Sequence, residues 1–453
     1  MTQPQALEIL KSGYNVFLTG PAGSGKTYLL NQYINYLKEN KVELGITAST
    51  GIASTHLNGR TIHSWCGMGI EQKLTDSQIE KLKDKELLWE RIRYAKVLII
   101  DEISMLNAGR LDLVDNICKQ FRENYAPFGG IQVILCGDFF QLPPVTRSDK
   151  EDSRFVVESN VWQDMGIKVC YLEEQYRQED QRFLQVLNDI RGSRVSAETH
   201  AILFERLNKP VGFKIKPTKL YTHNSNVDAY NQFELARLKG DETVYQMQSE
   251  GIPHLVKTLK ESCLALERLT LKPGAVVMFV KNNFDKGYVN GTLGTVKEID
   301  EESGYPLIKT VRGQEILAYP EKWTIEDGHK ILASISQVPL RLAWAITVHK
   351  SQGMSLDCAE IDLSKTFEYG MGYVALSRVR SLAGIKLLGL NDMALKVSDK
   401  VTELDKVLQQ QSRLDLEEFN QLGREAITVM QQEFVRQPEE AEVAESEISD
   451  IPF

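Results

Sequence analysis

The eight residues GPAGSGKT, from Gly20 to Thr27, constrain the fold of this chain more than any other feature of its sequence. An apolar run precedes them and a helical pattern follows, so the turn joins a buried strand to a helix. They fit the phosphate-loop template GxxxxGK[ST], in which glycines let backbone N–H groups turn toward phosphate oxygens at the positive end of a helix. A glycine-rich turn without a ligand is the alternative interpretation. The stretch predicts an α/β fold with a parallel sheet and a nucleotide site.

The residues of this loop are expected to bind different parts of a nucleoside triphosphate. Lys26 suits the β and γ oxygens, and Thr27 offers a hydroxyl to Mg²⁺. The remaining contacts come from the loop backbone and the start of the helix. The predicted ATP contacts in this stretch are Gly20, Pro21, Ala22, Gly23, Ser24, Gly25, Lys26, Thr27 and Tyr28.

A second apolar run, in AKVLIIDEISML, ends in the adjacent carboxylates Asp101 and Glu102. Such a pair also occurs in ordinary solvated turns. Downstream of a phosphate loop, Asp101 suits the carboxylate that holds Mg²⁺, and Glu102 suits the base that polarises an attacking water. The sequence therefore predicts ATP and Mg²⁺ as cofactors.

The stretch GGIQVILCGDFFQLPPV, residues 129–145, predicts a third strand that is followed by Gln141. If this strand lies beside the VLIID strand in one parallel sheet, Gln141 emerges at the carboxyl edge, where ligands of open α/β sheets bind. A neutral amide can hydrogen-bond both the γ-phosphate and the attacking water without competing for Mg²⁺. We therefore predict that Gln141 senses hydrolysis, the alternative being that it caps the LPPV turn.

Two arginines in the rest of the chain are candidates for the same site. Arg177 lies in EEQYRQ, just before a predicted helix, and Arg378 lies in GYVALSRVRS. Isolated arginines usually form surface salt bridges. If a second sheet faces the first across a cleft, both reach the γ-phosphate as arginine fingers, each worth roughly 10³ to 10⁵ in rate. We also place Gly353, from TVHKSQG, in the ATP site.

The charge distribution bears on whether a polyanion is a suitable partner. The net charge is -9, but residues 433–453 alone contain seven acidic residues and one arginine. The body of the chain is therefore close to neutral and can hold a local basic groove for nucleic acid, whereas its C-terminal end is strongly acidic.

Seven motifs, in this order, resemble the motif series of superfamily-one DNA helicases: GPAGSGKT, ITASTGIAS, IIDEISML, GDFFQLPPV, EEQYRQ, TVHKSQG and YVALSRVRS. The stretch LDLVDNICKQFRENYAPFGGIQVILCGDFFQLPPV resembles the signature of the Pif (petite integration frequency) family. The resemblance covers roughly residues 1–390. It implies a monomeric core of two RecA-like domains that moves 5′-to-3′ on single-stranded DNA and unwinds duplex. It also implies that Gln5 contacts adenine.

The resemblance further implies a division of the chain into domains. The expected order is a first RecA-like domain over residues 1–178, with a duplex-splitting wedge at about 64–92, and a second RecA-like domain over 179–270 and 336–395. A Src-homology-three-like β-barrel is expected at 271–335, where Lys281, Asn282 and Asn283 are either DNA contacts or plain turn residues. A helical extension at 396–432 and an acidic tail at 433–453 complete the chain.

Single-stranded DNA and DNA forks are the partners that the resemblance implies. Short polar groups suit backbone phosphates, and a histidine can also stack on a base, although a lone histidine is more often structural. The predicted DNA contacts are Thr50, His63, Thr347, His349, Lys350 and Ser351.

The ends of the chain and its cysteines complete the prediction. The start MTQPQALEILKSGYN lacks a basic and apolar leader, and the six cysteines lie far apart, so we expect a cytoplasmic protein with reduced thiols and no membrane association. A bacterial or phage source is expected from the last four residues, 450–453. The terminal DIPF resembles the tip of bacterial single-stranded-DNA-binding proteins. We expect the acidic tail either to dock on a protein partner or to cover this protein's own DNA channel.

Two other functions remain open at this level. A RecD-like helicase shares these motifs but does not need the PFGGIQ stretch. An ATP-gated DNA-binding switch would hydrolyse ATP without unwinding. Substitutions between Trp65 and Arg91 separate a helicase from the switch, because a helicase should lose unwinding and keep its DNA-stimulated ATPase, whereas a switch should lose neither.

Overall fold

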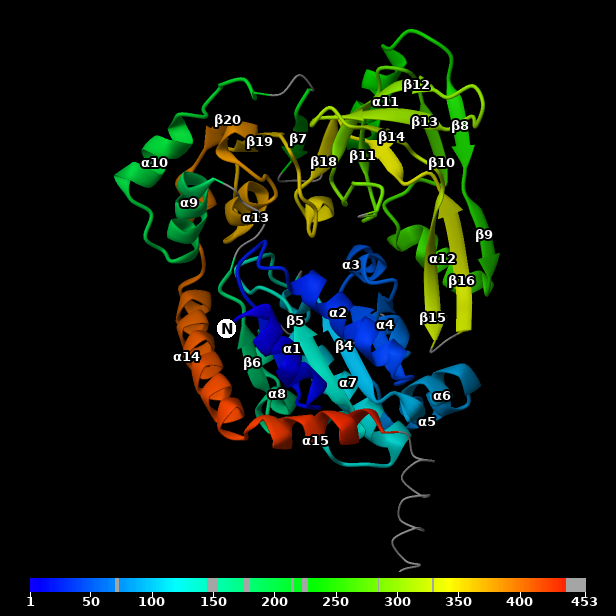
Figure 1. Ribbon diagram of the computed structural model, residues 1–453, viewed down its shortest axis with the longest axis vertical. Coiled ribbons are helices and arrows are strands. Elements are labelled where there is room, and N and C mark those ends of the chain that lie inside the picture. The colour runs from blue at the N-terminus through cyan, green and yellow to red at the C-terminus, as the bar shows by residue number, and fades with distance from the viewer. Residues whose placement is uncertain are drawn as a thin grey trace, which may run out of the picture.

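The molecule contains two parallel sheets and an antiparallel region beside the second sheet (Figure 1). This computed structural model describes residues 1–69, 73–144, 154–174, 180–212, 216–221, 227–283, 285–327 and 330–436. Arg177 and the DIPF tip therefore lie outside the described residues.

The first sheet has six parallel strands and contains the phosphate-loop strand near its middle. Its order is β3 (Arg60–Thr61), β2 (Leu44–Ala48), β4 (Val97–Asp101), β5 (Gln132–Cys136), β1 (Val16–Thr19), β6 (Lys168–Tyr171). Every residue of β1, β4 and β5 is buried, as expected for a sheet covered on both faces. The predicted pairing of the VLIID and IQVILC strands is confirmed, with Val97 opposite Gln132.

Helices cover both faces of this sheet and create two cores. Phe17 contributes to one core and its neighbours Val16 and Leu18 to the other, because successive side chains of a strand point to opposite faces. The helices of this half are α1 (Gln3–Lys11), α2 (Lys26–Glu39), α3 (Gly51–His56), α7 (Ala108–Arg122) and α8 (Asn160–Asp164).

Between β3 and β4 the chain forms a small helical insertion where the wedge was expected. Its helices are α4 (Ile62–Trp65), α5 (Asp76–Lys83) and α6 (Glu86–Tyr94). Arg91 ties α6 back to α4, because its Nε donates to the carbonyl of Trp65 at 3.0 Å. Tyr94, at the end of α6, is 63% exposed and stands edge-on to Trp89. The insertion thus presents aromatic surface to solvent.

The second sheet has four parallel strands. Its order is β18 (Ala345–Thr347), β7 (Thr218–Tyr221), β19 (Ala359–Leu363), β20 (Ile385–Leu390). The helices of this half are α9 (Gln181–Arg191), α10 (Ala197–Phe204), α11 (Val227–Ala236) and α13 (Met371–Ser377).

The antiparallel region lies between the strands of the second sheet in the sequence. One sheet has the order β14 (Glu315–Leu317), β13 (Pro306–Thr310), β12 (Leu293–Ile299), β11 (Val276–Phe279), β17 (Leu340–Leu342). A second has the order β15 (Glu321–Asp327), β16 (Lys330–Gln337), β9 (Gln248–Gly251), and β10 (Arg268–Leu271) pairs with β8 (Thr243–Gln246). Helix α12 (Pro253–Ser262) joins β9 to β10. Antiparallel strands thus begin ahead of residue 271, where the barrel was expected to start.

Two helices follow the second sheet and return to the first half of the molecule: α14 (Asp399–Gln421) and α15 (Arg424–Val435) (Figure 1). α14 runs along β6, the edge strand of the first sheet. Ser412 Oγ accepts from the Tyr171 amide at 3.1 Å, and Asp415 Oδ2 accepts from the Val169 amide at 2.7 Å. Side chains of α14 thereby satisfy backbone groups that the sheet leaves unpaired.

The six cysteines are free thiols, and five of them are buried. Within the described ranges, no helix is both long and apolar enough to cross a membrane.

Candidate functional site: a nucleotide site between two sheets

The phosphate loop follows β1 and ends where α2 begins. Gly20, Gly23 and Gly25 all have positive φ, at 142°, 86° and 83°. A Cβ on Gly20 would lie 2.4 Å from the carbonyl oxygen of Leu172, so only glycine fits there. The loop is therefore held in the cradle shape that the sequence predicts.

Lys26 points back into this loop. Its Nζ donates to the carbonyls of Gly20 and Pro21, at 2.9 and 3.1 Å. Burial lowers the pKa of Lys26, and the nearby Asp138 opposes that shift. Tyr28 is 57% exposed beside the loop, and Gln3 Nε2 donates to the carbonyl of Ser24 at 3.1 Å. The Oε1 atom of Gln5, expected near adenine, accepts from the Thr2 amide at 2.9 Å and caps α1.

The two predicted carboxylates lie at the end of β4, the strand that pairs with β5: Asp101 is its last residue and Glu102 follows it. Asp101 is 7% exposed, and its Oδ1 accepts from the Glu102 amide at 2.8 Å. Glu102 has a φ of 52°, so the chain turns sharply between the two side chains. Burial, with the charge of Asp101 added, raises the pKa of Glu102 to about 7. A carboxyl group with a raised pKa is suited to accept a proton from water.

The oxygens at this edge fit Mg²⁺, a hard cation that takes carboxylate and hydroxyl ligands together with substrate phosphates. Asp101 and Thr27 supply one group of each kind. In the phosphate loop, Ser24 Oγ is also buried and has no hydrogen-bond partner among the described residues. The donor set is therefore consistent with a metal bound through phosphate oxygens.

Gln141 lies at the same sheet edge, as predicted from the strand order. Its Nε2 donates to Asp138 Oδ2 at 3.4 Å, and its Oε1 is buried without a hydrogen-bond partner among the described residues. The side chain thus contacts Asp138, the second residue after β5. The unpartnered oxygen is a ready acceptor for a water or a phosphate-bound group.

Residues of the second half complete the site. Arg378 is 1% exposed at the end of α13, where its Nε donates to the carbonyl of Val374 at 2.9 Å and its Nη2 to Ser377 Oγ at 2.9 Å. Burial lowers the pKa of Arg378, and the charge of Glu102 opposes the shift. The guanidinium and the predicted base are therefore electrostatic neighbours across the cleft.

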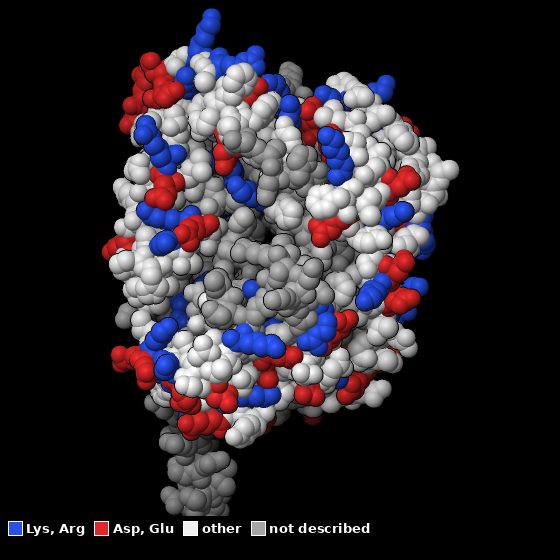
Figure 2. Space-filling model, turned by 180° about the vertical axis from the view of Figure 1, so that it is seen from behind, with Lys and Arg blue, Asp and Glu red and all other residues white. Residues whose placement is uncertain are grey.

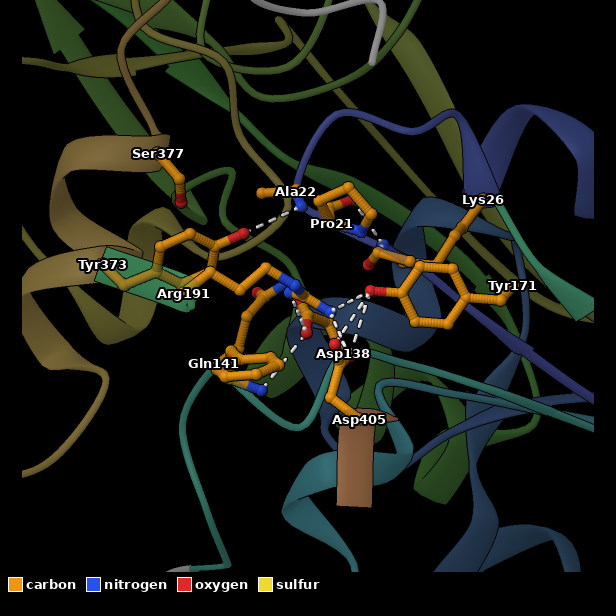
Figure 3. A network of polar contacts seen from close by, with 12 residues as sticks. Pro21, Ala22, Lys26, Asp138, Gln141, Tyr171, Arg191, Tyr373, Ser377 and Asp405 are labelled. Carbon is orange, nitrogen blue, oxygen red and sulfur yellow. Dashed lines mark hydrogen bonds and ion pairs between the residues drawn. The ribbon is translucent and has the colours of Figure 1, made fainter. Parts of the chain in front are cut away.

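Two contacts across the cleft involve residues to which the sequence assigned no role. Tyr373 Oη accepts from the Ala22 amide of the phosphate loop at 3.1 Å (Figure 3). Gln352 Nε2 donates to Glu102 Oε2 at 3.0 Å. Both residues lie inside quoted motifs, YVALSRVRS and TVHKSQG, and this was the only signal that could have marked them. Gly353, in contrast, approaches His56 and not the loop, so its predicted ATP contact stays a prediction.

The predicted DNA residues come from both halves of the chain. Thr50 caps α3, and the partly buried His63 contacts Arg110, while burial and the Arg110 charge lower the pKa of His63 to about 4. His349 is exposed, whereas Ser351 is fully buried and donates to the carbonyl of Val348 at 2.8 Å. The buried hydroxyl of Ser351 stabilises its turn, so this geometry disfavours a direct DNA contact.

Thr347 and Lys350 belong to the same turn as His349. The Lys350 amide donates to Thr347 Oγ1 at 3.2 Å. His56, at the end of α3, meets this turn, because a Cβ on Gly353 would lie 2.7 Å from His56 Cε1. The structure therefore brings α3 of the first half and residues 347–353 of the second half together.

On the face shown in Figure 2, basic and acidic side chains of the described residues are interspersed, so any DNA contact there depends on local groups.

His56 allows a prediction about pH. Its Nε2 lies 2.9 Å from Asn290 Nδ2, and burial lowers its pKa to about 4 from about 6.5 in an unfolded chain. The unfolded state therefore takes up the proton first, and stability contributed by neutral His56 is lost as pH falls from about 6.5 toward 4. We expect the drop in Tm between about pH 7.5 and pH 5 to be smaller in His56→Gln than in the wild type. The exposed His254→Gln serves as control, and equal drops in all three chains would contradict the assignment.

Comparison with known proteins places this site in a family. The family model described as "PIF1-like helicase" matches residues 5–201, and "DNA helicase Pif1, 2B domain" matches residues 254–299. A relative from Psychrobacter, "ATP-dependent DNA helicase Pif1", is 44% identical over 96% of this chain and 75% of its own length.

Solved structures from Bacteroides agree with this assignment. The Pif1 complex with ADP-AlF4 has a TM-score of 0.75 at 30% identity and covers 91% of this chain and 97% of its own. The Bacteroides Pif1 bound to ssDNA has a TM-score of 0.59 at 30% identity, with 90% and 97% covered. The two parallel sheets are therefore the two RecA-like domains of such enzymes, and the chain belongs to the Pif1-like helicase family.

Proposed function

We propose that the protein is an ATP-dependent DNA helicase that translocates 5′-to-3′ on single-stranded DNA and opens duplex ahead of it. The observation that carries this is the composition of the nucleotide site. Groups from both RecA-like domains meet there, as the contacts of Tyr373 with Ala22 and of Gln352 with Glu102 show. A site assembled from two bodies can convert hydrolysis into their relative movement.

The chemistry follows from the positions of these groups. Lys26 and the loop amides bind the β- and γ-phosphates, and Glu102 accepts the proton of the attacking water. Gln141 holds that water through its unpartnered Oε1, and Arg378 neutralises charge that develops on the transferred phosphoryl group. Thr27 and Asp101 would hold Mg²⁺, which neutralises phosphate charge when it is bound. Arg177 is proposed as a second arginine finger on its motif alone.

The DNA path is proposed from the residues that meet beside this site. Thr50 lies at the start of α3, and α3 meets the turn with Thr347, His349 and Lys350 through His56. His63 is proposed on the resemblance alone. The relative bound to ssDNA supports single-stranded DNA as the ligand. Small movements of the second domain would then shift one set of DNA contacts relative to the other. The helices α4 to α6 are proposed as the wedge that separates strands at a fork.

Several finer expectations belong to this proposal. Together with the helicase activity we propose the domain limits given above and a barrel-like character of the antiparallel region. We also propose a monomeric active form and a cytoplasmic location. G-quadruplex and RNA–DNA hybrid substrates are proposed on the same basis.

Strand separation on two partial duplexes tests the proposal. With ATP and Mg²⁺, we expect unwinding of a duplex with a 5′ single-stranded tail and none with a 3′ tail. Lys26→Ala should abolish unwinding and ATP turnover, because the phosphates lose their cation. Opening from the 3′ tail would contradict the polarity, and DNA-stimulated ATP turnover with neither duplex opened would replace the motor with an ATP-gated switch.

A further inference from the structure

A buried ion cluster lies beneath the nucleotide site (Figure 3), and three of its residues come from outside all the motifs: Tyr171, Arg191 and Asp405. Arg191, at the end of α9, pairs through Nη1 with Asp138 Oδ1 at 2.7 Å and through Nη2 with Asp405 Oδ1 at 3.0 Å. Asp138 and Arg191 are 0% and 8% exposed at their side chains. Tyr171 Oη lies 3.1 Å from Arg191 Nη2 and donates to Asp405.

Asp138 connects this cluster to the predicted sensor. It lies three positions before Gln141 and accepts from both that side chain and the backbone of the turn. Its Oδ2 accepts from Gln141 Nε2 at 3.4 Å, and its Oδ1 accepts from the Phe140 amide at 3.2 Å. The Arg191 guanidinium also lies 4.0 Å from the centre of the Phe140 ring. Arg191 therefore fixes the turn that carries Gln141.

Asp405 belongs to α14, and the chain just before this helix is hydrogen-bonded to the second RecA-like domain. The Gly370 amide, just before α13, donates to the carbonyl of Lys396 at 3.2 Å. Farther along, α14 is fastened to β6 through Ser412 and Asp415. Gln409 Nε2 donates to Asp405 Oδ2 at 2.6 Å and orients the carboxylate. The helix thus connects the domain that contributes Arg378 with the ion cluster under the sensor.

We propose that Asp405 is a positioning residue for ATP hydrolysis: through Arg191 and Asp138, α14 holds the turn of Gln141 in the place where the amide can orient water. This inference rests on the proposed role of Gln141. The alternative is that α14 only covers the edge of the sheet. In that case loss of Asp405 would lower stability without a specific effect on turnover.

Asp405→Asn tests the proposal, with Asp415→Asn as a matched control on the same helix. Both substitutions remove a carboxylate that contacts the first domain, but only Asp405 contacts Arg191. We expect both variants to lower Tm, whereas Asp405→Asn alone should lower kcat for ATP with single-stranded DNA by roughly tenfold at a similar KM. Asp405→Glu should restore part of kcat.

A double substitution tests whether the effect passes through the sensor. If it does, Asp405→Asn should cause little further loss of kcat in a Gln141→Ala background, because coupled residues are not additive. Gln409→Ala, which removes one hydrogen bond from the Asp405 carboxylate and keeps its charge, should cause a smaller loss in the same direction. Folded Asp405→Asn with wild-type kcat, an equal loss in Asp415→Asn, or full additivity with Gln141→Ala would overturn the proposal.

The outcomes separate this proposal from the helicase assignment. A wild-type chain that hydrolyses ATP but opens neither duplex would contradict the helicase activity. The proposed effect of Asp405 on Gln141 would still be measurable as ATP turnover. A wild-type kcat in Asp405→Asn would contradict the coupling and leave the motor unaffected.

Discussion

Replacement of Arg378 by alanine is expected to slow ATP turnover by about 10³- to 10⁵-fold while the protein stays folded enough to bind DNA. The guanidinium is buried and close to Glu102, so it acts in a site where water screens its charge poorly. Alanine leaves the charge of the transferred phosphoryl group without this partner. The measurement is kcat for ATP at saturating single-stranded DNA, together with DNA affinity.

Arg380→Ala is the control for this substitution. Arg380 follows two positions later, but it is 27% exposed and lies 3.8 Å from Asp357, away from Glu102. It should keep kcat within about threefold, a change of well under 1 kcal/mol in the barrier. If Arg378→Ala and Arg380→Ala lose turnover equally, the arginine-finger role is wrong and the motif has a structural role.

Glu102→Gln is expected to lower kcat by about 10²- to 10⁴-fold, because the amide cannot accept a proton from water. Glutamine keeps the shape of the side chain, and its oxygen can still accept from Gln352 Nε2 as Glu102 Oε2 does. ATP binding should therefore remain, since Lys26 and the loop are unchanged. Single-turnover hydrolysis, beside equilibrium binding of a fluorescent ATP analogue, separates the two effects.

Glu123→Gln provides a matched control. Glu123 is an exposed glutamate with a φ of 53°, close to the 52° of Glu102, so the same change is made on the same backbone conformation. It should leave kcat unchanged. A large loss of ATP affinity in Glu102→Gln, with an unchanged rate of the bound nucleotide, would show that Glu102 holds the substrate and does not act as the base.

The part of the site that follows parallel strands was predictable from the sequence. Lys26 and Gln141 come after an apolar strand and Asp101 ends one, and parallel strands of one sheet bring their carboxyl ends to one edge. The pairing of β4 with β5 then determines that Gln141 lies near the carboxylates. Local motifs and one rule of sheet geometry were sufficient for this result.

The contacts across the cleft were not predictable in the same way. Tyr373 and Ala22 are separated by 351 positions, and their contact depends on how two domains pack. Arg191 and Asp405 meet only because α14 returns to β6, and nothing in its charged helical pattern distinguishes Asp405 from the other acids of that helix. Such pairs depend on tertiary geometry and leave no periodic signal.

Strand β9 of the antiparallel region shows a second reason why some elements could not be predicted from the sequence. β9 has the sequence QSEG and is exposed throughout, so it lacks the alternation of apolar and polar residues that indicates a strand. It pairs antiparallel with β16, with Ala333 opposite Gly251. This polar strand lies ahead of residue 271, where the β-barrel is expected to begin, and the expected domain limits stay a prediction.

The position of α14 along β6 also prevents edge-to-edge pairing of β6 with a strand of another chain. An uncovered edge strand presents a row of unpaired amides and carbonyls on which another chain can add a strand. Ser412 and Asp415 occupy the Tyr171 and Val169 amides with side chains that cannot continue a ladder. α14 contributes Asp405 to the ion cluster beneath the nucleotide site, and farther along it covers the edge strand and so opposes aggregation. Solubility and catalysis therefore constrain the same helix.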